Sequence, residues 1–119
     1  MQEDDKLLDS LISIAFEFFR FKDIFEKMIS KLDFDEQSKY RNQYSWFSKK
    51  VDRALESAQI KVLNLQGKLY DPGMAVSPLN IDDLNKDDQL YIVQMIEPTV
   101  LKNDAVYRIG TVVLGRESR

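Results

Sequence analysis

Apolar residues recur along the N-terminal part of the chain at alternating steps of four and three residues. The positions are Leu7, Leu11, Ile14, Phe18, Phe21, Phe25, Met28 and Leu32. This spacing is typical of a helix that packs lengthwise on other helices. Further apolar residues, such as Ile12, Phe16 and Phe19, make the apolar face wider than one neighbouring helix can cover. The pattern therefore predicts a helical bundle to which more than one chain contributes.

The first helix is expected to run from about Asp4 to Leu32, because neither glycine nor proline interrupts this stretch. Asp4 and Asp5 would lie in its first turn, where negative charge interacts favourably with the helix dipole. Asp33, followed by Glu36, is typical of a helix N-cap with its reciprocating acid. The chain is therefore expected to turn at Asp33 and begin a second helix, which makes a helical hairpin.

The second expected helix carries an apolar stripe with the same period. Its positions are Tyr40, Tyr44, Phe47, Val51, Ala54 and Ala58, and Leu55 and Val62 widen the stripe near its end. The small residues Ala54 and Ala58 leave room for aromatic rings of an antiparallel first helix. Gly67 marks a point at which the helix has ended. Residues 1–66 are therefore interpreted as a helical hairpin that serves as a dimerisation unit.

The helical period disappears after Gly67, and all three prolines of the chain lie beyond this point. Residues 89–96 and 106–114 are rich in β-branched and aromatic side chains, and residues 102–104 between them favour a turn. These segments predict an antiparallel hairpin. Pro98 is expected to end or bulge its first strand, because proline cannot donate a hydrogen bond to the ladder.

Shorter strands are expected at Leu69-Tyr70 and Ala75-Val76, in the same small sheet. Residues 67–119 are therefore interpreted as a C-terminal β domain, and the fold class is α+β. A sheet of roughly fifty residues is marginal alone. We expect it to depend on the helices or on a partner.

Composition narrows the possible functions. The 119 residues are 44% hydrophobic and 11% aromatic, which suffices for a packed domain. The chain has no cysteine and no histidine, which excludes disulfides, the common zinc sites, and Cys-His or Ser-His catalysis. Lysine and arginine total 17 against 20 acidic residues without basic runs, so nucleic acid is not an expected partner. We expect a cytoplasmic protein with no membrane partner, because neither a secretory signal nor a spanning segment is visible.

The acidic segment 83–88 resembles the first half of a calcium loop. It lacks the glycine that the sharp turn needs, where Asp88 stands, and the bidentate glutamate, whose place is taken by Gln94. A solvated turn is expected there and no metal site. The four glycines form no phosphate-binding loop, and no carboxylate pair is set apart for acid-base chemistry. We therefore expect neither a cofactor nor enzyme activity.

Trp46 lies off the apolar stripe of the second expected helix. An indole in such a position either reaches a second helix pair or marks an exposed contact site. The sequence leaves both interpretations open.

Two runs in the C-terminal half resemble those of a known family. The first is Gly67-Lys68-Leu69-Tyr70-Asp71-Pro72, and the second is Asn103-Asp104-Ala105-Val106-Tyr107-Arg108-Ile109-Gly110-Thr111-Val112-Val113. They are similar to the Gly-x-x-Phe-Asp-Pro and Asn-Asp-Arg-Val-Ile-Arg-Pro-Ala-x-Val-x-Val runs of the GrpE family. Members of this family are the nucleotide exchange factors of DnaK-type chaperones. The resemblance covers residues 40–115 of the chain.

The resemblance implies a homodimer whose helical hairpins form a four-helix bundle, with a small β wing from each chain. In the family the wing contacts the nucleotide-binding domain of the chaperone, opens its lobes and releases ADP, which requires no catalytic residue. The expected partner-binding residues are Met74, Glu97, Asn103, Asp104 and Arg108. The expected core of the dimeric bundle consists of Leu11, Ile14, Phe18, Phe21, Phe25, Met28, Tyr44, Phe47, Val51 and Leu55.

The chain departs from the family pattern at two places in the closing run. Ala105 replaces the first arginine, and Ile109-Gly110 replace Pro-Ala. The long paired helix that precedes the bundle in the family has little room here, so a short, divergent member is implied. The alternative is a GrpE-fold dimeric adaptor or structural module without exchange activity, which the loss of the arginine favours. A simple turn at Asn103-Asp104 and an ordinary strand charge at Arg108 also remain open.

Overall fold

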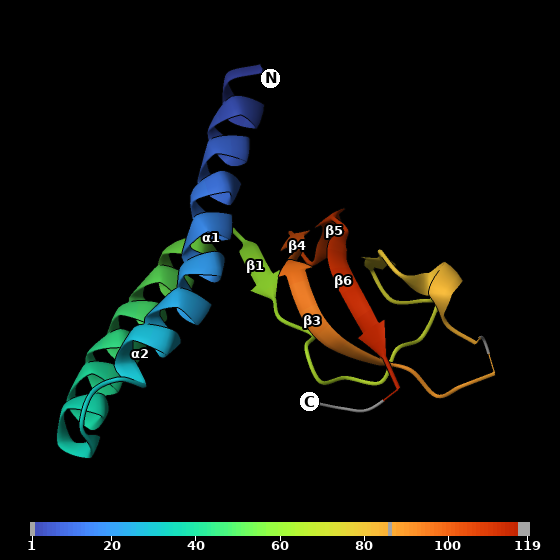
Figure 1. Ribbon diagram of the computed structural model, residues 1–119. Helices are drawn as coiled ribbons and strands as arrows, with labels where there is room; N and C mark the ends of the chain where they lie inside the picture. Colours follow the sequence, from blue (N-terminus) through green and yellow to red (C-terminus); the bar gives the residue numbers. More distant parts are fainter. Residues whose placement is uncertain (1, 86, 117–119) are drawn as a thin grey trace. The chain divides into compact units, whose positions relative to one another are not determined.

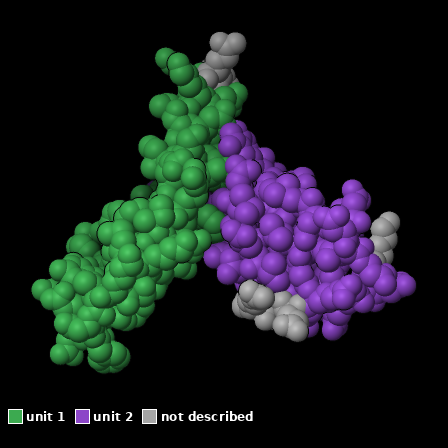
Figure 2. Space-filling model, in the orientation of Figure 1, with its two compact units in different colours: residues 1–55 green, residues 56–119 purple. Residues whose placement is uncertain are grey.

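The computed structural model describes residues 2–85 and 87–116 and divides the chain into two compact units (Figure 2). Met1–Leu55 form the helical unit, and Glu56–Arg119 form the β unit. In the described residues two long helices precede sheets that are mainly antiparallel (Figure 1). The expected α+β fold class is therefore confirmed.

The helical unit is a hairpin of helix α1 (Gln2–Ile29) and helix α2 (Phe34–Ser57), whose last two residues belong to the β unit (Figure 1). Asp33 caps α2, because its Oδ1 atom accepts the backbone N–H of Glu36 at 2.9 Å. Acidic residues occupy the first turn of both helices, where the helix dipole favours them. The predicted turn at Asp33 is therefore confirmed.

Helix α2 ends at Ser57 and does not continue toward Gly67, which corrects the expected boundary of the helix. Gln59 has a φ of 58°, in the left-handed region, and turns the chain out of the helix. Strand β1 (Ile60–Leu63) follows at once and pairs antiparallel within the β unit. Val62 therefore lies in a strand, because sheet pairing and burial outweigh the helical period of the sequence.

The β unit is built on a long hairpin whose two arms bend. Its further strands are β2 (Val76–Pro78), β3 (Tyr91–Glu97), β4 (Thr99–Lys102), β5 (Ala105–Arg108) and β6 (Gly110–Gly115). The first arm contains β3 and β4, the second contains β5 and β6, and the bends fall at Pro98 and Ile109. The predicted antiparallel hairpin with an interruption at Pro98 is therefore confirmed.

The tip of the hairpin is a tight turn that joins β4 to β5. Lys102 pairs with Ala105, which leaves Asn103 and Asp104 as the central residues of the turn. Their φ angles are 53° and 64°, so both lie in the left-handed region that a type I′ turn requires. Asparagine and aspartate tolerate this conformation better than other residues with a side chain. The local sequence is therefore sufficient to form the turn.

The two bends divide the hairpin between two sheets. Among the described residues, one sheet has the strand order β1-β4-β5 and the other has the order β2-β6-β3. Strand β2 runs parallel to β6, with Val76 opposite Gly110, whereas the sequence predicted an antiparallel sheet throughout. The Ala75 carbonyl explains the arrangement, because it accepts the Thr99 hydroxyl at 2.8 Å and the Gly110 N–H at 3.1 Å. These bonds tie the segment before β2 to both arms at the bend.

The core of the β unit follows from the two-residue period of its strands. Alternate residues of β6 are buried, namely Gly110, Val112 and Leu114. The buried apolar side chains of the unit are Ile60, Val76, Leu90, Ile92, Met95, Pro98, Val100, Val112 and Leu114. Nearly every strand contributes to this set, so the unit has its own hydrophobic core.

The short strand expected at Leu69-Tyr70 is a single bridge, between Leu69 and Tyr91. The Gly67 N–H donates to the Ile92 carbonyl at 2.7 Å, which brings this run alongside the start of β3. Gly67 has a φ of 89°, a conformation that a residue with a side chain adopts only with strain. The first family-like run therefore begins at a position that requires glycine.

We expect Gly110→Ala to lower the free energy of unfolding of the β unit by about 1–3 kcal/mol. An added Cβ atom would lie 2.6 Å from the Thr99 Oγ1 atom and 2.9 Å from the Glu97 carbonyl oxygen. Gly73→Ala is the control, because the nearest atom to its Cβ would be 3.6 Å away. Urea unfolding followed by circular dichroism measures both variants, and an unchanged midpoint for Gly110→Ala would contradict the tight packing at the bend.

Candidate interaction surfaces

Aromatic rings join the two helices of the helical unit. The Phe25 and Tyr44 rings stack with their centroids 4.7 Å apart, and the Phe18 and Tyr44 centroids are 6.0 Å apart. Phe47 meets Phe18 edge to face at 5.4 Å. Such pairs add about 0.5–1.5 kcal/mol beyond the burial of their area. Phe18 and Phe25 therefore form the side of the apolar stripe that faces α2.

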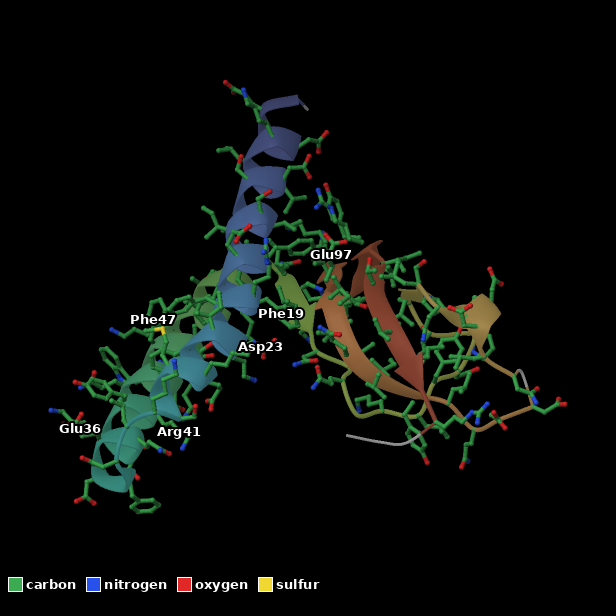
Figure 3. All side chains as sticks on the ribbon, viewed as in Figure 1. Phe19, Asp23, Glu36, Arg41, Phe47 and Glu97 are labelled. Atoms are coloured by element: carbon green, nitrogen blue, oxygen red, sulfur yellow. The ribbon has the colours of Figure 1, made fainter. Side chains whose placement is uncertain are left out.

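An ion pair closes the hairpin nearer its turn. The Nη2 atom of Arg41, which is labelled in Figure 3, lies 3.1 Å from the Glu26 Oε2 atom. Arg41 also donates to the Gln37 side chain at 3.1 Å. Both ionic side chains are about half exposed, so the pair contributes little to stability. Its effect is to favour one alignment of the helices.

The other side of the stripe on α1 is exposed. Leu7 is 69% exposed and Ile14 is 68% exposed, and Phe21 and Met28 continue the row at the same spacing of seven residues. Residues seven apart lie within about 20° of one another around a helix, so these side chains form one face. Stable monomers seldom leave a large apolar patch in water. This face, which we call the α1 apolar row, is a candidate interface.

The structure places the ten residues expected in the bundle core at three levels of burial within one chain. Leu55 is buried. Leu11, Phe18, Phe25, Tyr44 and Val51 are half-buried. Ile14, Phe21, Met28 and Phe47 are exposed. Phe47, which is labelled in Figure 3, nevertheless contacts Phe18. The hairpin therefore covers one side of the expected core and leaves the other side open.

Trp46 is not one of the residues expected in the bundle core and is 64% exposed. The Lys50 Nζ atom lies 3.9 Å from the centroid of its indole ring, in a cation–π contact. Of the two interpretations left by the sequence, the structure favours an exposed position for Trp46 within the single chain.

Two of the expected partner-binding residues occupy the tip of the β hairpin. Asn103 and Asp104 are exposed, and the Asp104 Oδ1 atom lies 3.5 Å from the Lys61 Nζ atom. The Asn103 N–H donates to the Gln59 carbonyl at 2.9 Å, so the tip is held against the chain entering β1. The tip therefore presents polar groups on a rigid turn.

The other expected partner-binding residues lie toward the bends. Glu97 ends β3, and its Oε1 atom accepts the Thr111 hydroxyl at 3.1 Å (Figure 3). Arg108 ends β5 and is half-buried. Met74 precedes β2, and its sulfur accepts the Asp71 N–H at 3.2 Å. The five residues therefore divide between the tip and the bends and do not converge on one point.

Sequence reasoning missed an apolar group on the hairpin. Ile96, Val106 and Ile109 are exposed, at the end of β3 and along the returning arm. The available signal was Ile109, which stands where the similar GrpE run has proline and adds an apolar side chain at a bend. Apolar residues form the core of many protein interfaces, and polar residues surround them at the rim.

The described residues of the acidic segment, 83–85 and 87–88, and the Asp71-Pro72 run both form turns, and Lys86 of the expected turn lies outside the described residues. The Asn85 Oδ1 atom accepts the Asp87 N–H at 3.1 Å, and the Asp71 Oδ1 atom accepts the Gly73 N–H at 3.3 Å. Within residues 2–85 and 87–116, no group of three or more acidic side chains is arranged to hold a metal ion. The helices in the same residues are not long and apolar enough to cross a membrane.

Comparison of the chain with models of protein families, with curated proteins and with solved structures finds no significant match. The functional argument therefore depends on the residues, the surfaces and the resemblance of the two runs.

We expect the alkaline stability of the helical unit to depend on Tyr44. Burial raises the pKa of its phenol above the ordinary value near 10, and Glu26, Asp52 and Asp23 raise it further. The folded chain then holds this proton more tightly than the unfolded chain. Stability is therefore full below about pH 10 and falls as the pH rises through the pKa of the folded state.

Tyr44→Phe removes this titration. Its free energy of unfolding should change less than that of the wild type between about pH 9.5 and 11. Urea unfolding of both proteins across this range measures the difference. Parallel pH profiles would contradict the raised pKa of Tyr44.

Proposed function

We propose that the chain is a GrpE-like cochaperone that binds the nucleotide-binding domain of a DnaK-type chaperone and promotes ADP release. The closing run, residues 103–113, carries this proposal, because it resembles the family's run and forms the turn and return arm of the hairpin. The order of parts, a helical hairpin followed by a β unit, agrees with what the resemblance implies. The proposed localisation is cytoplasmic.

The proposal includes a homodimer. The α1 apolar row and Phe47 are exposed in a single chain, and they include four of the residues expected in a bundle core. A second copy would cover this surface with the same residues, as a two-fold interface requires. Four helices would then enclose the apolar face that one hairpin leaves open.

The exchange reaction needs only a difference in binding. A factor that binds the open nucleotide-binding domain more tightly than the closed one shifts the population toward the open state, from which ADP leaves. No bond is made or broken by the factor. Exposed polar side chains on a tight turn, such as Asn103 and Asp104, suit this role because the backbone loses little conformational entropy on binding.

A dimeric adaptor without exchange activity is the second candidate function. Ala105, in place of the family's arginine, is exposed at the first position of β5 and provides no charge there. The adjoining Val106 is also exposed. This part of the hairpin is therefore more apolar than the family pattern implies.

We expect the wild type to have the mass of a dimer by light scattering at micromolar concentration. Ile14→Glu combined with Phe21→Glu should yield monomers, because truncating or charging central apolar contacts weakens dimers by about thirtyfold or more per site. Arg20→Glu is the control, since it places a carboxylate at an exposed polar position of the same helix. A monomeric wild type, or a double variant that stays dimeric, would contradict the proposed dimer.

We expect the wild type to accelerate the release of a fluorescent ADP analogue from a DnaK-type chaperone in stopped-flow measurements. Asn103→Gly with Asp104→Gly should reduce the acceleration at least about fivefold, because glycine preserves the turn but removes both side chains. Asn42→Ala, at an exposed position of α2, is the control. Absence of acceleration by the wild type at any concentration would contradict exchange and favour the adaptor.

A further inference from the structure

The β unit contains an apolar pocket with a volume of about 480 Å³. Its wall combines the run that follows Gly67, the 3-10 helix η1 (Ile81–Asp83) with the residue after it, and the approach to β3. The lining residues are Leu69, Tyr70, Pro72, Ile81, Leu84, Asp88, Gln89 and Leu90. Pockets of about 300–1,000 Å³ with mostly apolar walls are typical of ligand sites.

Hydrogen bonds hold the walls of this pocket in place. The Tyr70 N–H donates to the Leu90 carbonyl at 2.7 Å, which joins two walls. The Asn80 side chain, just before η1, donates to the Leu114 carbonyl at 2.8 Å and accepts the Leu114 N–H at 2.9 Å. The wall that contains η1 is therefore anchored to β6. A pocket formed before binding loses little conformational entropy when it is filled.

Apolar side chains at this pocket remain open to solvent. Leu69 is 50% exposed, while Leu90 is buried. Ile81 and Leu84 are half-buried. Covering the exposed Leu69 side chain with another apolar group lowers the free energy.

Each wall carries aspartates directly beside its lining residues. Asp71 stands between Tyr70 and Pro72, and residues 81–90 contain four aspartates and one lysine. The Asp88 carboxylate lies 2.8 Å from the Arg116 Nε atom, so one of these charges is already paired. The aspartates of the walls, apart from Asp88, are Asp71, Asp82, Asp83 and Asp87, and all four are exposed. Lys68, beside Leu69, is also exposed, so the charges that neighbour the lining residues along the chain, which we call the rim, are net negative. The pocket is thus apolar inside with an acidic rim.

We infer that this pocket binds a peptide segment of a partner protein in which large apolar side chains are flanked by lysine or arginine. Apolar side chains fill the pocket, and the flanking cations interact with the aspartates at its rim. Complementary charge of this kind selects the partner and speeds association. The inference does not depend on nucleotide exchange, because it rests on the pocket and its rim alone.

A labelled nonapeptide tests the inference by fluorescence anisotropy with the full chain. The probe has a central leucine-phenylalanine-leucine group with two lysines and a terminal glycine on either side. We expect saturable binding that weakens as salt is raised, because exposed charges are screened. Two control peptides replace the lysines by glutamates or the central group by serines, and neither should bind.

Variants of the chain locate the binding. Leu69→Ser should weaken it at least about fivefold through lost apolar contact. Leu79→Ser is its matched control, since Leu79 is 66% exposed in the same unit but does not line the pocket. Asp82→Lys with Asp83→Lys should also weaken binding at least about fivefold. The pair Asp4→Lys with Asp5→Lys, on α1, should not.

Circular dichroism confirms that each variant is folded, and methyl NMR of Leu69 and Leu84 reports occupation of the pocket. Shifts of these methyl signals on addition of the lysine peptide would support the site. Failure of this peptide to bind at millimolar concentration would overturn the inference. Equal binding of the glutamate peptide, or binding unchanged by Leu69→Ser and by the rim variant, would also overturn it. Each of these results is independent of the rate of ADP release.

Discussion

Close approach of the two hairpin arms at their bends is the constraint on which the β unit depends. Gly110 has no side chain, and an added Cβ would fall within 3 Å of both Thr99 and Glu97. Because the arms come this close, the Ala75 carbonyl reaches both of them and brings β2 alongside β6. Beyond the bend the arms diverge into a separate sheet, which β1 completes. The turn at the tip and the pocket walls are held by the two sheets that result.

A second constraint acts on the helical unit. Rings on α1 and α2 pack together on one side of the apolar stripe, and the α1 apolar row remains exposed on the other. The hydrophobic effect disfavours such a surface in water, so it supports association with another molecule. A second copy is the proposed molecule, because the exposed residues continue the same heptad spacing that packs the hairpin. The proposed cochaperone would thus use apolar contacts to dimerise and polar contacts to bind its chaperone.

Local signals in the sequence were sufficient for several elements. The N-cap at Asp33 and the turn at Asn103 and Asp104 depend on residues within a few positions, and both were predicted. The end of α2 was not, because the residues between Ser57 and Gly67 include neither glycine nor proline and keep a helical period. Pairing of β1 with β4 joins residues about forty positions apart, and no local pattern reveals it.

The candidate sites also divide into those that the local sequence reveals and those that depend on residues far apart in the chain. The apolar stripe was visible from its spacing, whereas the pocket brings together Leu69, Leu84 and Leu90 from three walls and has no signature in the order of residues. The parallel placement of β2 was missed for the same reason, since it follows from hydrogen bonds at the bend. Glu97, Asn103, Asp104 and Arg108 of the expected partner residues lie on the hairpin, and Met74 lies before β2. Only the structure separates the tip from the bends.

The most direct test of the proposed cochaperone function measures the affinity of the chain for a DnaK-type nucleotide-binding domain with and without saturating ADP. Linkage requires that a factor which weakens ADP binding is itself bound more weakly when ADP is present, by the same ratio. We predict tight binding to the nucleotide-free domain and binding at least about tenfold weaker with ADP. Equal affinity in the two conditions, or no binding in either, would contradict the proposal.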